Sequence, residues 1–190
     1  MTRFEDIKAF AFDIDGVFTD GLVLAMPDGD LLRQFNSKDC YAVRTAVNNG
    51  YTCAIITGGV SQSLLYRSRS LGIEDRHLYM LSKDKEVDLR HFCDSIGLDL
   101  AQVAFVGDDI PDIPSIRLAG LGVCPADAVA EVREAADMVS SFNGGRGCIR
   151  DLVERVLKSQ GNWKFDPKDP WKGNHLEHIM KLAKLTGRNI

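Results

Sequence analysis

Short apolar runs alternate along the chain with longer stretches in which apolar residues recur every three or four positions. The runs have the length of buried strands, and the longer stretches have the length of helices. Strands are expected at residues 9–14, 52–56, 77–81, 103–106 and 121–124. Helices are expected at residues 39–49, 61–71, 83–96, 112–119 and 128–135. This alternation predicts an α/β fold, a doubly wound parallel sheet with helices on both faces.

Two segments depart from the alternation. Residues 22–24 and 31–35 flank the turn-rich sequence Pro27-Asp28-Gly29-Asp30, which predicts a β-hairpin projecting from the carboxyl end of the sheet. Beyond residue 160, prolines, tryptophans and alternating charges predict an irregular linker, and residues 174–186 have the pattern of a short amphipathic helix. We therefore expect one domain over residues 1–160 and a C-terminal linker and helix over 161–190.

The composition argues against several classes of function. The 190 residues are 45% hydrophobic and 26% charged, with a formal net charge of −4, whereas a nucleic-acid partner would favour a basic chain. No apolar run approaches the roughly 18 residues of a membrane span, and the N-terminus lacks the pattern of a secretory signal. The five cysteines form no Cys-x-x-Cys pair, which argues against a zinc site or a disulfide framework. We expect a cytoplasmic protein without a nucleic-acid or membrane partner.

The first expected strand runs directly into two carboxylates, Asp13 and Asp15. Desolvated carboxylates are costly unless a partner compensates them, and a divalent cation would do so. One acid could attack phosphorus while the other handles protons. Asp-x-Asp alone is common, however, and a solvated turn would explain it equally well.

Candidate phosphate-binding groups occur at two further places, after the second expected strand and at the start of an expected helix. Thr57, Gly58 and Gly59 follow the second strand, where a hydroxyl and exposed backbone could approach a ligand closely. Lys83 and Lys85 lie at the start of a helix, where the helix dipole disfavours a cation. Taken singly, an ordinary turn and a surface lysine explain these two features best.

A second acidic cluster follows the fourth strand, in the sequence Gly107-Asp108-Asp109-Ile110-Pro111-Asp112. An Asx-rich turn would explain one acidic cluster but not two at two strand ends. Carboxyl ends of strands are where open α/β sheets place ligands. The two clusters together predict a hard-cation site built from oxygen ligands.

In order and spacing, the four motifs resemble those of the haloacid dehalogenase superfamily, and the resemblance extends over roughly residues 8–160. It implies a Rossmann-like fold and a Mg²⁺-dependent phosphatase. Dehalogenases of this fold lack the second acid of the first motif, so the presence of Asp15 favours phosphate chemistry.

The resemblance also implies roles for individual residues. Asp13 would form an aspartyl-phosphate, and Asp15 would protonate the leaving alcohol and then activate water. Mg²⁺ would be held by Asp13, by the backbone carbonyl of Asp15 and by Asp108.

The remaining roles concern the residues around these groups. Asp109 or Asp112 would orient Lys85, with Lys83 as the alternative motif lysine. Thr57, together with backbone N–H groups near Gly16 and Gly58, would bind phosphoryl oxygens.

The spacing leaves no room for a cap domain between the motifs. This capless layout resembles the 3-deoxy-D-manno-octulosonate-8-phosphate phosphatase family, and the segments that agree are 15–21, 35–39, 107–109 and 144–147. Lys38, in segment 35–39, and Arg146, in segment 144–147, are candidates for substrate contact. Two positions depart from the family pattern: Gly59 replaces a usual arginine and Cys40 a usual glycine.

The family resemblance implies a homotetramer in which a neighbour's hairpin covers each site, and a sugar-acid phosphate as substrate. A nonulosonate 9-phosphate is an alternative to the octulosonate ester. A non-catalytic assembly module that partners a sugar nucleotidyltransferase is a second alternative, and a phosphatase for proteins or nucleic acids is a third.

Overall fold

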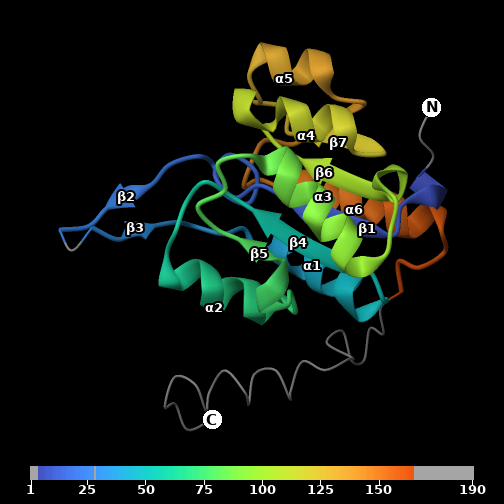
Figure 1. The fold of residues 1–190 in the computed structure, drawn as a ribbon, viewed down its shortest axis with the longest axis horizontal. Coiled ribbons are helices and arrows are strands. Elements are labelled where there is room, and N and C mark those ends of the chain that lie inside the picture. The colour runs from blue at the N-terminus through green and yellow to red at the C-terminus, as the bar shows by residue number, and fades with distance from the viewer. Residues whose placement is uncertain (1–3, 28, 165–190) are drawn as a thin grey trace, which may run out of the picture.

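The computed structural model describes residues 4–27 and 29–164. Its centre is a six-stranded parallel sheet with the order β5-β4-β1-β6-β7-β8 (Figure 1). The strands are β1 (Ala9–Phe12), β4 (Thr52–Ile56), β5 (Leu78–Tyr79), β6 (Val103–Val106), β7 (Leu121–Cys124) and β8 (Met138–Val139). The expected helix at 174–186 lies outside the described residues, as does most of the expected linker.

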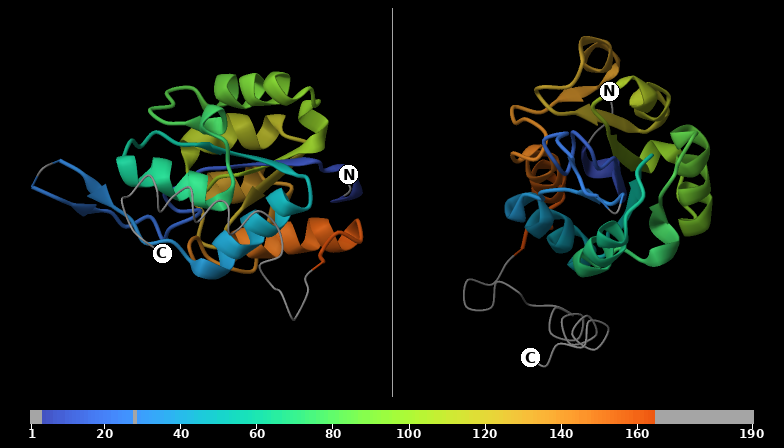
Figure 2. Two further views of the ribbon diagram at one scale, coloured as in Figure 1. Left: turned by 90° about the horizontal axis from the view of Figure 1, so that it is seen from below. Right: turned by 90° about the vertical axis from the view of Figure 1, so that its left-hand side faces the viewer.

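Within the described residues, six α-helices cover the sheet on both faces (Figure 2). They are α1 (Ser37–Asn48), α2 (Gln62–Leu71), α3 (Lys85–Ile96), α4 (Ile113–Leu118), α5 (Ala130–Ala135) and α6 (Cys148–Ser159). Short 3₁₀ turns occur at Phe4–Asp6, Asp75–His77, Leu100–Gln102 and Ile110–Asp112. Helices α1, α2 and α6 pack in one apolar layer and α3, α4 and α5 in the other, which confirms the doubly wound fold. Among the described helices, none has the length and apolarity needed to cross a bilayer.

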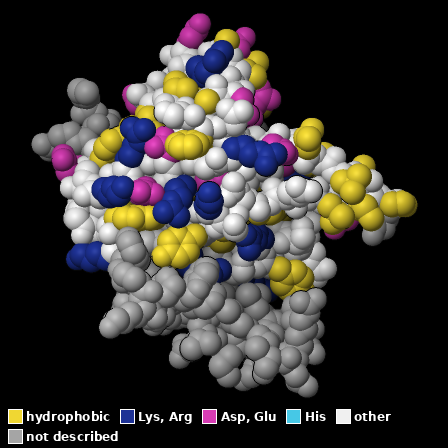
Figure 3. All heavy atoms as spheres, turned by 180° about the vertical axis from the view of Figure 1, so that it is seen from behind, with side chains coloured by type: hydrophobic (Ala, Val, Ile, Leu, Met, Phe, Trp, Pro, Cys, Tyr) yellow, Lys and Arg dark blue, Asp and Glu magenta, His cyan; other side chains and the backbone are white. Residues whose placement is uncertain are grey.

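The expected hairpin is present and projects from the body of the molecule. Strands β2 (Leu24–Ala25) and β3 (Leu31–Leu32) pair in antiparallel fashion, with Leu24 opposite Leu32. Apolar side chains gather on this projection (Figure 3), where Leu22 is 75% exposed and Leu24 63%. The described residues between β1 and β4 form only loops, this hairpin and α1, so they contain no cap domain.

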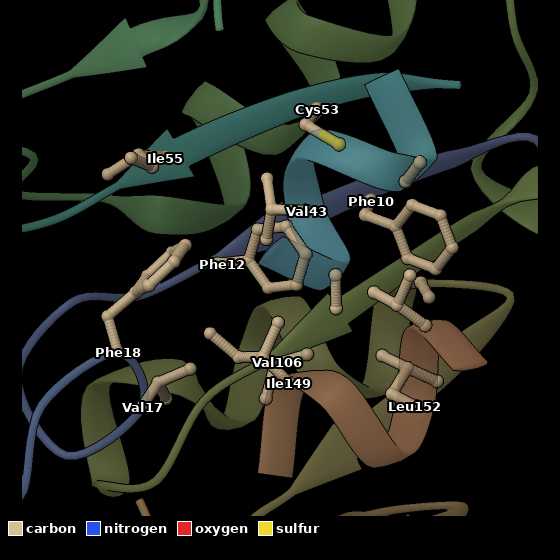
Figure 4. Close-up of a cluster of buried hydrophobic side chains, with 14 of the residues drawn as sticks. Phe10, Phe12, Val17, Phe18, Val43, Cys53, Ile55, Val106, Ile149 and Leu152 are labelled. Carbon is tan, nitrogen blue, oxygen red and sulfur yellow. The ribbon is translucent and has the colours of Figure 1, made fainter. Parts of the chain in front are cut away.

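The central strand β1 separates the two apolar layers by simple alternation. Phe10 and Phe12 enter the layer of α1 and α6, whereas Ala9 and Ala11 enter the layer of α3 and α4. The two phenylalanine rings stack with centroids 6.1 Å apart, and Phe18 from the following loop meets Phe12 edge-on (Figure 4). All four strand residues are fully buried, so the chain that leaves β1 begins from a rigid base.

The register of the three central strands brings their carboxyl ends together. Phe12 of β1 is level with Ile55 of β4 and with Val106 of β6. The residues that follow each strand therefore emerge at one edge, at the point where the chain changes direction across the sheet.

Two elements were not expected from the sequence, β8 and α6. Helix α6 buries apolar residues at helical spacing on one side, Ile149, Leu152, Val153, Val156 and Leu157. Periodicity therefore predicts this helix, although the sequence analysis expected no helix between residues 135 and 174. Strand β8 has only two residues, too few for a period-2 signal. Conversely, β1 ends at Phe12, two residues before the expected end at residue 14, and Asp13 is the first residue of the loop that follows.

Helix α6 is attached to α1 through a buried carboxylate. Asp39, in the first turn of α1, is fully buried and accepts hydrogen bonds from the backbone N–H groups of Gly147 (3.0 Å) and Arg150 (2.8 Å). These donors belong to the first turn of α6, which has no earlier helical carbonyls to bond. Asp39 therefore supplies the N-terminal cap of a helix more than a hundred residues away.

The Asp39→Ala variant should lose about 1–3 kcal/mol of the free energy of unfolding, because it leaves two buried donors without an acceptor. Urea unfolding measures this loss. Asp39→Asn keeps one strong acceptor and should lose less. Asp94→Ala, which removes an exposed acid from α3, is the matched control and should stay within about 0.5 kcal/mol of wild type. Equal stabilities of Asp39→Ala and Asp94→Ala would contradict the capping role.

Candidate active site

Asp13 lies immediately after β1 with its side chain largely buried. Its backbone N–H donates to the carbonyl of Val106 (2.9 Å), which ties the start of the loop to β6. Its Oδ2 lies 3.0 Å from Nζ of Lys85. Burial raises the pKa of Asp13, and the nearby carboxylate of Asp112 raises it further. The result is a pKa of about 6, although Lys85 opposes the shift.

Lys85 is the first residue of α3 and lies between two acids. Its Nζ is 2.7 Å from Oδ1 of Asp112 as well as 3.0 Å from Asp13. Burial by itself would lower the pKa of Lys85, but Asp13 and Asp112 together raise it above its ordinary value. Lys83 is exposed, so of the two candidate lysines it is Lys85 that reaches the acids. Asp84 caps the helix through the N–H groups of the next turn, which fixes the position of Lys85.

Asp108, two residues after β6, completes the acidic cluster. Carboxylate oxygens of Asp13, Asp108 and Asp112 all lie within 4.8 Å of one another. Asp112 is already engaged, because its Oδ1 accepts from Lys85 and its Oδ2 from the backbone N–H groups of Asp108 (3.0 Å) and Asp109 (3.3 Å). In contrast, Oδ1 of Asp108 is buried with no hydrogen-bond partner among the described residues.

The free oxygen of Asp108 and the crowding of acids indicate a cation site. Burial, followed by the charges of Asp13 and Asp112, raises the pKa of Asp108 to about 7. A divalent cation would relieve this repulsion, and carboxylate oxygens are the donors that Mg²⁺ prefers. The residues therefore fit Mg²⁺, with Asp13 and Asp108 as ligands and Asp112 holding Lys85. Gly16 fits the same arrangement, because it adopts a φ of +82° and a Cβ there would overlap the carboxylate of Asp108.

Thr57 follows β4, the strand beside β1, and is almost fully buried. Its backbone N–H donates to the carbonyl of Tyr79 (2.9 Å), and its Oγ1 accepts from the N–H of Gly59 (3.2 Å). A Cβ on Gly58 would meet nothing closer than the carbonyl oxygen of Ser82, at 3.7 Å. The Thr57 hydroxyl and the Gly58 backbone therefore lie at the same edge of the sheet as Asp13.

Asp15 has a partner that the sequence analysis did not identify. Arg33, just after β3, donates from Nε to Oδ1 of Asp15 (2.7 Å) and from Nη2 to Oδ2 (2.9 Å). The Arg33 side chain is only 2% exposed, whereas that of Asp15 is 35% exposed. The sequence gives little sign of this pair, because its two residues are 18 positions apart and meet only when the hairpin folds back.

The side chains of three expected site residues have partners or neighbours other than the three clustered carboxylates. The Asp109 carboxylate accepts from the N–H of Ile110 (2.8 Å) and caps the short turn there. Lys38 and Arg146 line one groove beside α6, together with Phe142, and Arg146 forms an ion pair with Asp20 (3.1 Å). None of the three clustered carboxylates lines this groove.

Comparison with known proteins identifies the family. The haloacid dehalogenase-like hydrolase family matches residues 76–152. The 3-deoxy-D-manno-octulosonate 8-phosphate phosphatase of Salmonella typhi is 35% identical over 85% of this chain and 85% of its own. The chain belongs to this phosphatase family. The corresponding enzyme of Escherichia coli K12 is 34% identical over the same shares.

Solved structures of the 3-deoxy-D-manno-octulosonate 8-phosphate phosphatase family share the fold. That of Yersinia pestis is 34% identical, with a TM-score of 0.80 over 84% of this chain and 85% of its own. That of Moraxella catarrhalis is 29% identical, with a TM-score of 0.79 over 94% of both chains, and is in complex with magnesium, phosphate and the sugar acid. The expected superfamily, fold, phosphomonoesterase activity and Mg²⁺ cofactor are therefore confirmed.

Without metal, the acidic cluster should make the protein less stable as pH rises. The folded-state pKa of Asp108 is about 7 against an ordinary value of 3.8, so the folded state binds more protons between these values. The free energy of unfolding in chelator should therefore fall from about pH 4 to about pH 8, and Mg²⁺ should restore it at the upper end.

Thermal unfolding with and without chelator measures this dependence. The matched variant Asp108→Asn lacks the titrating carboxyl and should show a shallower fall with pH and a smaller gain from Mg²⁺. Identical pH profiles for wild type and Asp108→Asn would contradict the assigned repulsion.

Proposed function

We propose that the chain hydrolyses 3-deoxy-D-manno-octulosonate 8-phosphate to the free sugar acid and inorganic phosphate, with Mg²⁺ as cofactor. The observation that carries this proposal is the cluster of Asp13, Asp108, Asp112 and Lys85 at one sheet edge. Relatives that match most of the chain supply the substrate, because they are phosphatases for this ester.

In the first half-reaction, a carboxylate oxygen of Asp13 attacks phosphorus. The bond from phosphorus to the sugar oxygen breaks, and Asp15 gives that oxygen a proton, so the sugar leaves as an alcohol. Lys85 holds the attacking carboxylate in place and neutralises charge next to it. Mg²⁺ held by Asp13 and Asp108 would supply further charge neutralisation at the phosphoryl group.

In the second half-reaction, water attacks the phosphorus of the aspartyl-phosphate. Asp15 now accepts a proton from that water, the bond from phosphorus to Asp13 breaks, and inorganic phosphate is released. The Thr57 hydroxyl and the backbone N–H groups near Gly16 and Gly58 bind phosphoryl oxygens in both steps. The protein thus returns to its starting state with one water consumed.

The Asp13→Asn variant should lose turnover by many orders of magnitude, because an amide is a poor nucleophile and a weak metal ligand. Phosphate release from the sugar ester and from a small aryl phosphate measures this loss. Asp94→Asn, an equivalent change at an exposed site, should retain wild-type kcat. Wild-type turnover by pure, folded Asp13→Asn protein would exclude Asp13 as the nucleophile.

Two alternatives use the same fold. A nonulosonate 9-phosphate would engage the same cluster, and kcat/KM values for the two sugar phosphates distinguish these substrates. A non-catalytic assembly module would not need the Lys85 ion pairs, and metal-dependent hydrolysis of an aryl phosphate would exclude that role. The division into a domain at 1–160 and a tail at 161–190, and the cytoplasmic location, remain parts of the proposal.

We further infer a homotetramer assembled through the hairpins. Leu22, Leu24 and Leu32 are exposed on a two-stranded element, which is marginal in water unless another surface covers it. Hairpins from several subunits would cover one another in a closed, symmetric assembly and shield the open site of a neighbour from bulk water.

The double variant Leu22→Ser, Leu24→Ser should weaken assembly, because it removes apolar area from the projecting surface. Light scattering at micromolar concentration should give about four times the 21.0 kDa chain mass for wild type and less for the variant. Val87→Ser removes an exposed apolar residue from α3, away from the hairpin, and should not change the mass. A wild-type monomer with full activity on the sugar phosphate would contradict the tetramer.

A further inference from the structure

Arg33 is a buried cation that has no role in the mechanism described above. Its guanidinium makes two hydrogen bonds to the carboxylate of Asp15, and Nη1 donates to the carbonyl of Leu31 (3.0 Å). An arginine with a side chain only 2% exposed is unusual unless its charge has a defined partner. In the structure this partner is Asp15, on the loop that carries the nucleophile.

The guanidinium occupies a space that Gly59 leaves open. A Cβ on Gly59 would lie 2.8 Å from Nη2 of Arg33 and 3.6 Å from Oγ1 of Thr57. Gly59 does not have a positive φ, so its backbone conformation does not require glycine. A Cβ at this position would still fit beside Thr57, but the guanidinium of Arg33 would have to move aside.

The charges around the site favour a second role for this guanidinium. Lys85 is held by both Asp13 and Asp112, so it is shared between two acids before any substrate arrives. Arg33 is paired with Asp15, which is partly exposed and can be hydrated when it is released. The planar fork that matches a carboxylate also matches two oxygens of a phosphoryl group.

We propose that Arg33 binds the phosphoryl group, exchanging the carboxylate of Asp15 for two phosphoryl oxygens when the phosphomonoester enters. The exchange leaves the Asp15 oxygens free to face the leaving group. This inference deepens the proposed phosphatase function and rests on it. Because Arg33 follows directly after β3, it also makes the hairpin a part of the phosphate site and not only a surface for assembly.

The test measures the affinity of the Mg²⁺-loaded protein for inorganic phosphate by calorimetry, beside kcat and KM for an aryl phosphate and for the sugar phosphate. Arg33→Ala should weaken phosphate binding about tenfold to about a hundredfold and lower kcat/KM similarly for both substrates. Arg33→Lys keeps the charge without the fork and should lie between Arg33→Ala and wild type.

Gly59→Ala tests the same geometry without removing a charge. Its methyl group would displace the guanidinium, so phosphate affinity should fall although Arg33 is intact. Arg76→Ala removes an exposed arginine paired with Glu74 and is the matched control, with phosphate affinity as in wild type. Thermal unfolding of each variant separates a loss of affinity from a loss of fold.

Unchanged phosphate affinity in folded Arg33→Ala and Gly59→Ala proteins would overturn the proposal. A loss for the sugar phosphate alone, with wild-type values for inorganic phosphate and the aryl ester, would also overturn it, because the guanidinium would then bind the sugar's carboxylate. The proposed function fails separately, if wild-type protein binds phosphate with Mg²⁺ but hydrolyses neither ester.

Discussion

Repulsion among carboxylates at the carboxyl ends of β1 and β6 is the constraint on which the rest of the structure depends. Carboxylate oxygens of Asp13, Asp108 and Asp112 lie within 4.8 Å of one another, because the register of β1 with β6 and the turn after β6 bring the three residues together. Burial increases the cost of this arrangement. Lys85 offsets part of this cost through two ion pairs, and the free oxygen of Asp108 leaves a place for a cation. A bound cation would balance the remaining negative charge. The buried strands hold the carboxylates in place, so the acids cannot move apart to reduce their repulsion.

What could be predicted from the sequence follows from the sheet. Asp13, Thr57 and Asp108 each come directly or almost directly after a strand of apolar residues, so the rule that ligands bind at strand ends places them together. Arg33 was missed because its position depends on how a short hairpin folds back, which no periodicity encodes. The groove that Lys38 and Arg146 line likewise depends on the packing of α6, a helix that the sequence analysis did not predict.

The structure also connects regions that are far apart in the sequence to the loop of the first motif. Asp39 of α1 holds the N-terminus of α6, and the Gly144-Gly145 segment just before that helix packs against the backbone at Gly16 and Thr19. The segment just before α6 thus packs against the loop that would bind phosphoryl oxygens.

The pairing of β2 with β3 has a consequence for the fidelity of folding. Leu32 is partly exposed on the hairpin, whereas Arg33, the next residue, points into the site, because neighbouring residues of an extended chain face opposite sides. A slip of one residue in the pairing of Leu24 with Leu32 would exchange these two faces. It would turn the guanidinium of Arg33 toward solvent and place a leucine beside Asp15. The carboxylate would then lose its ion-pair partner, so a misaligned hairpin would carry an electrostatic penalty.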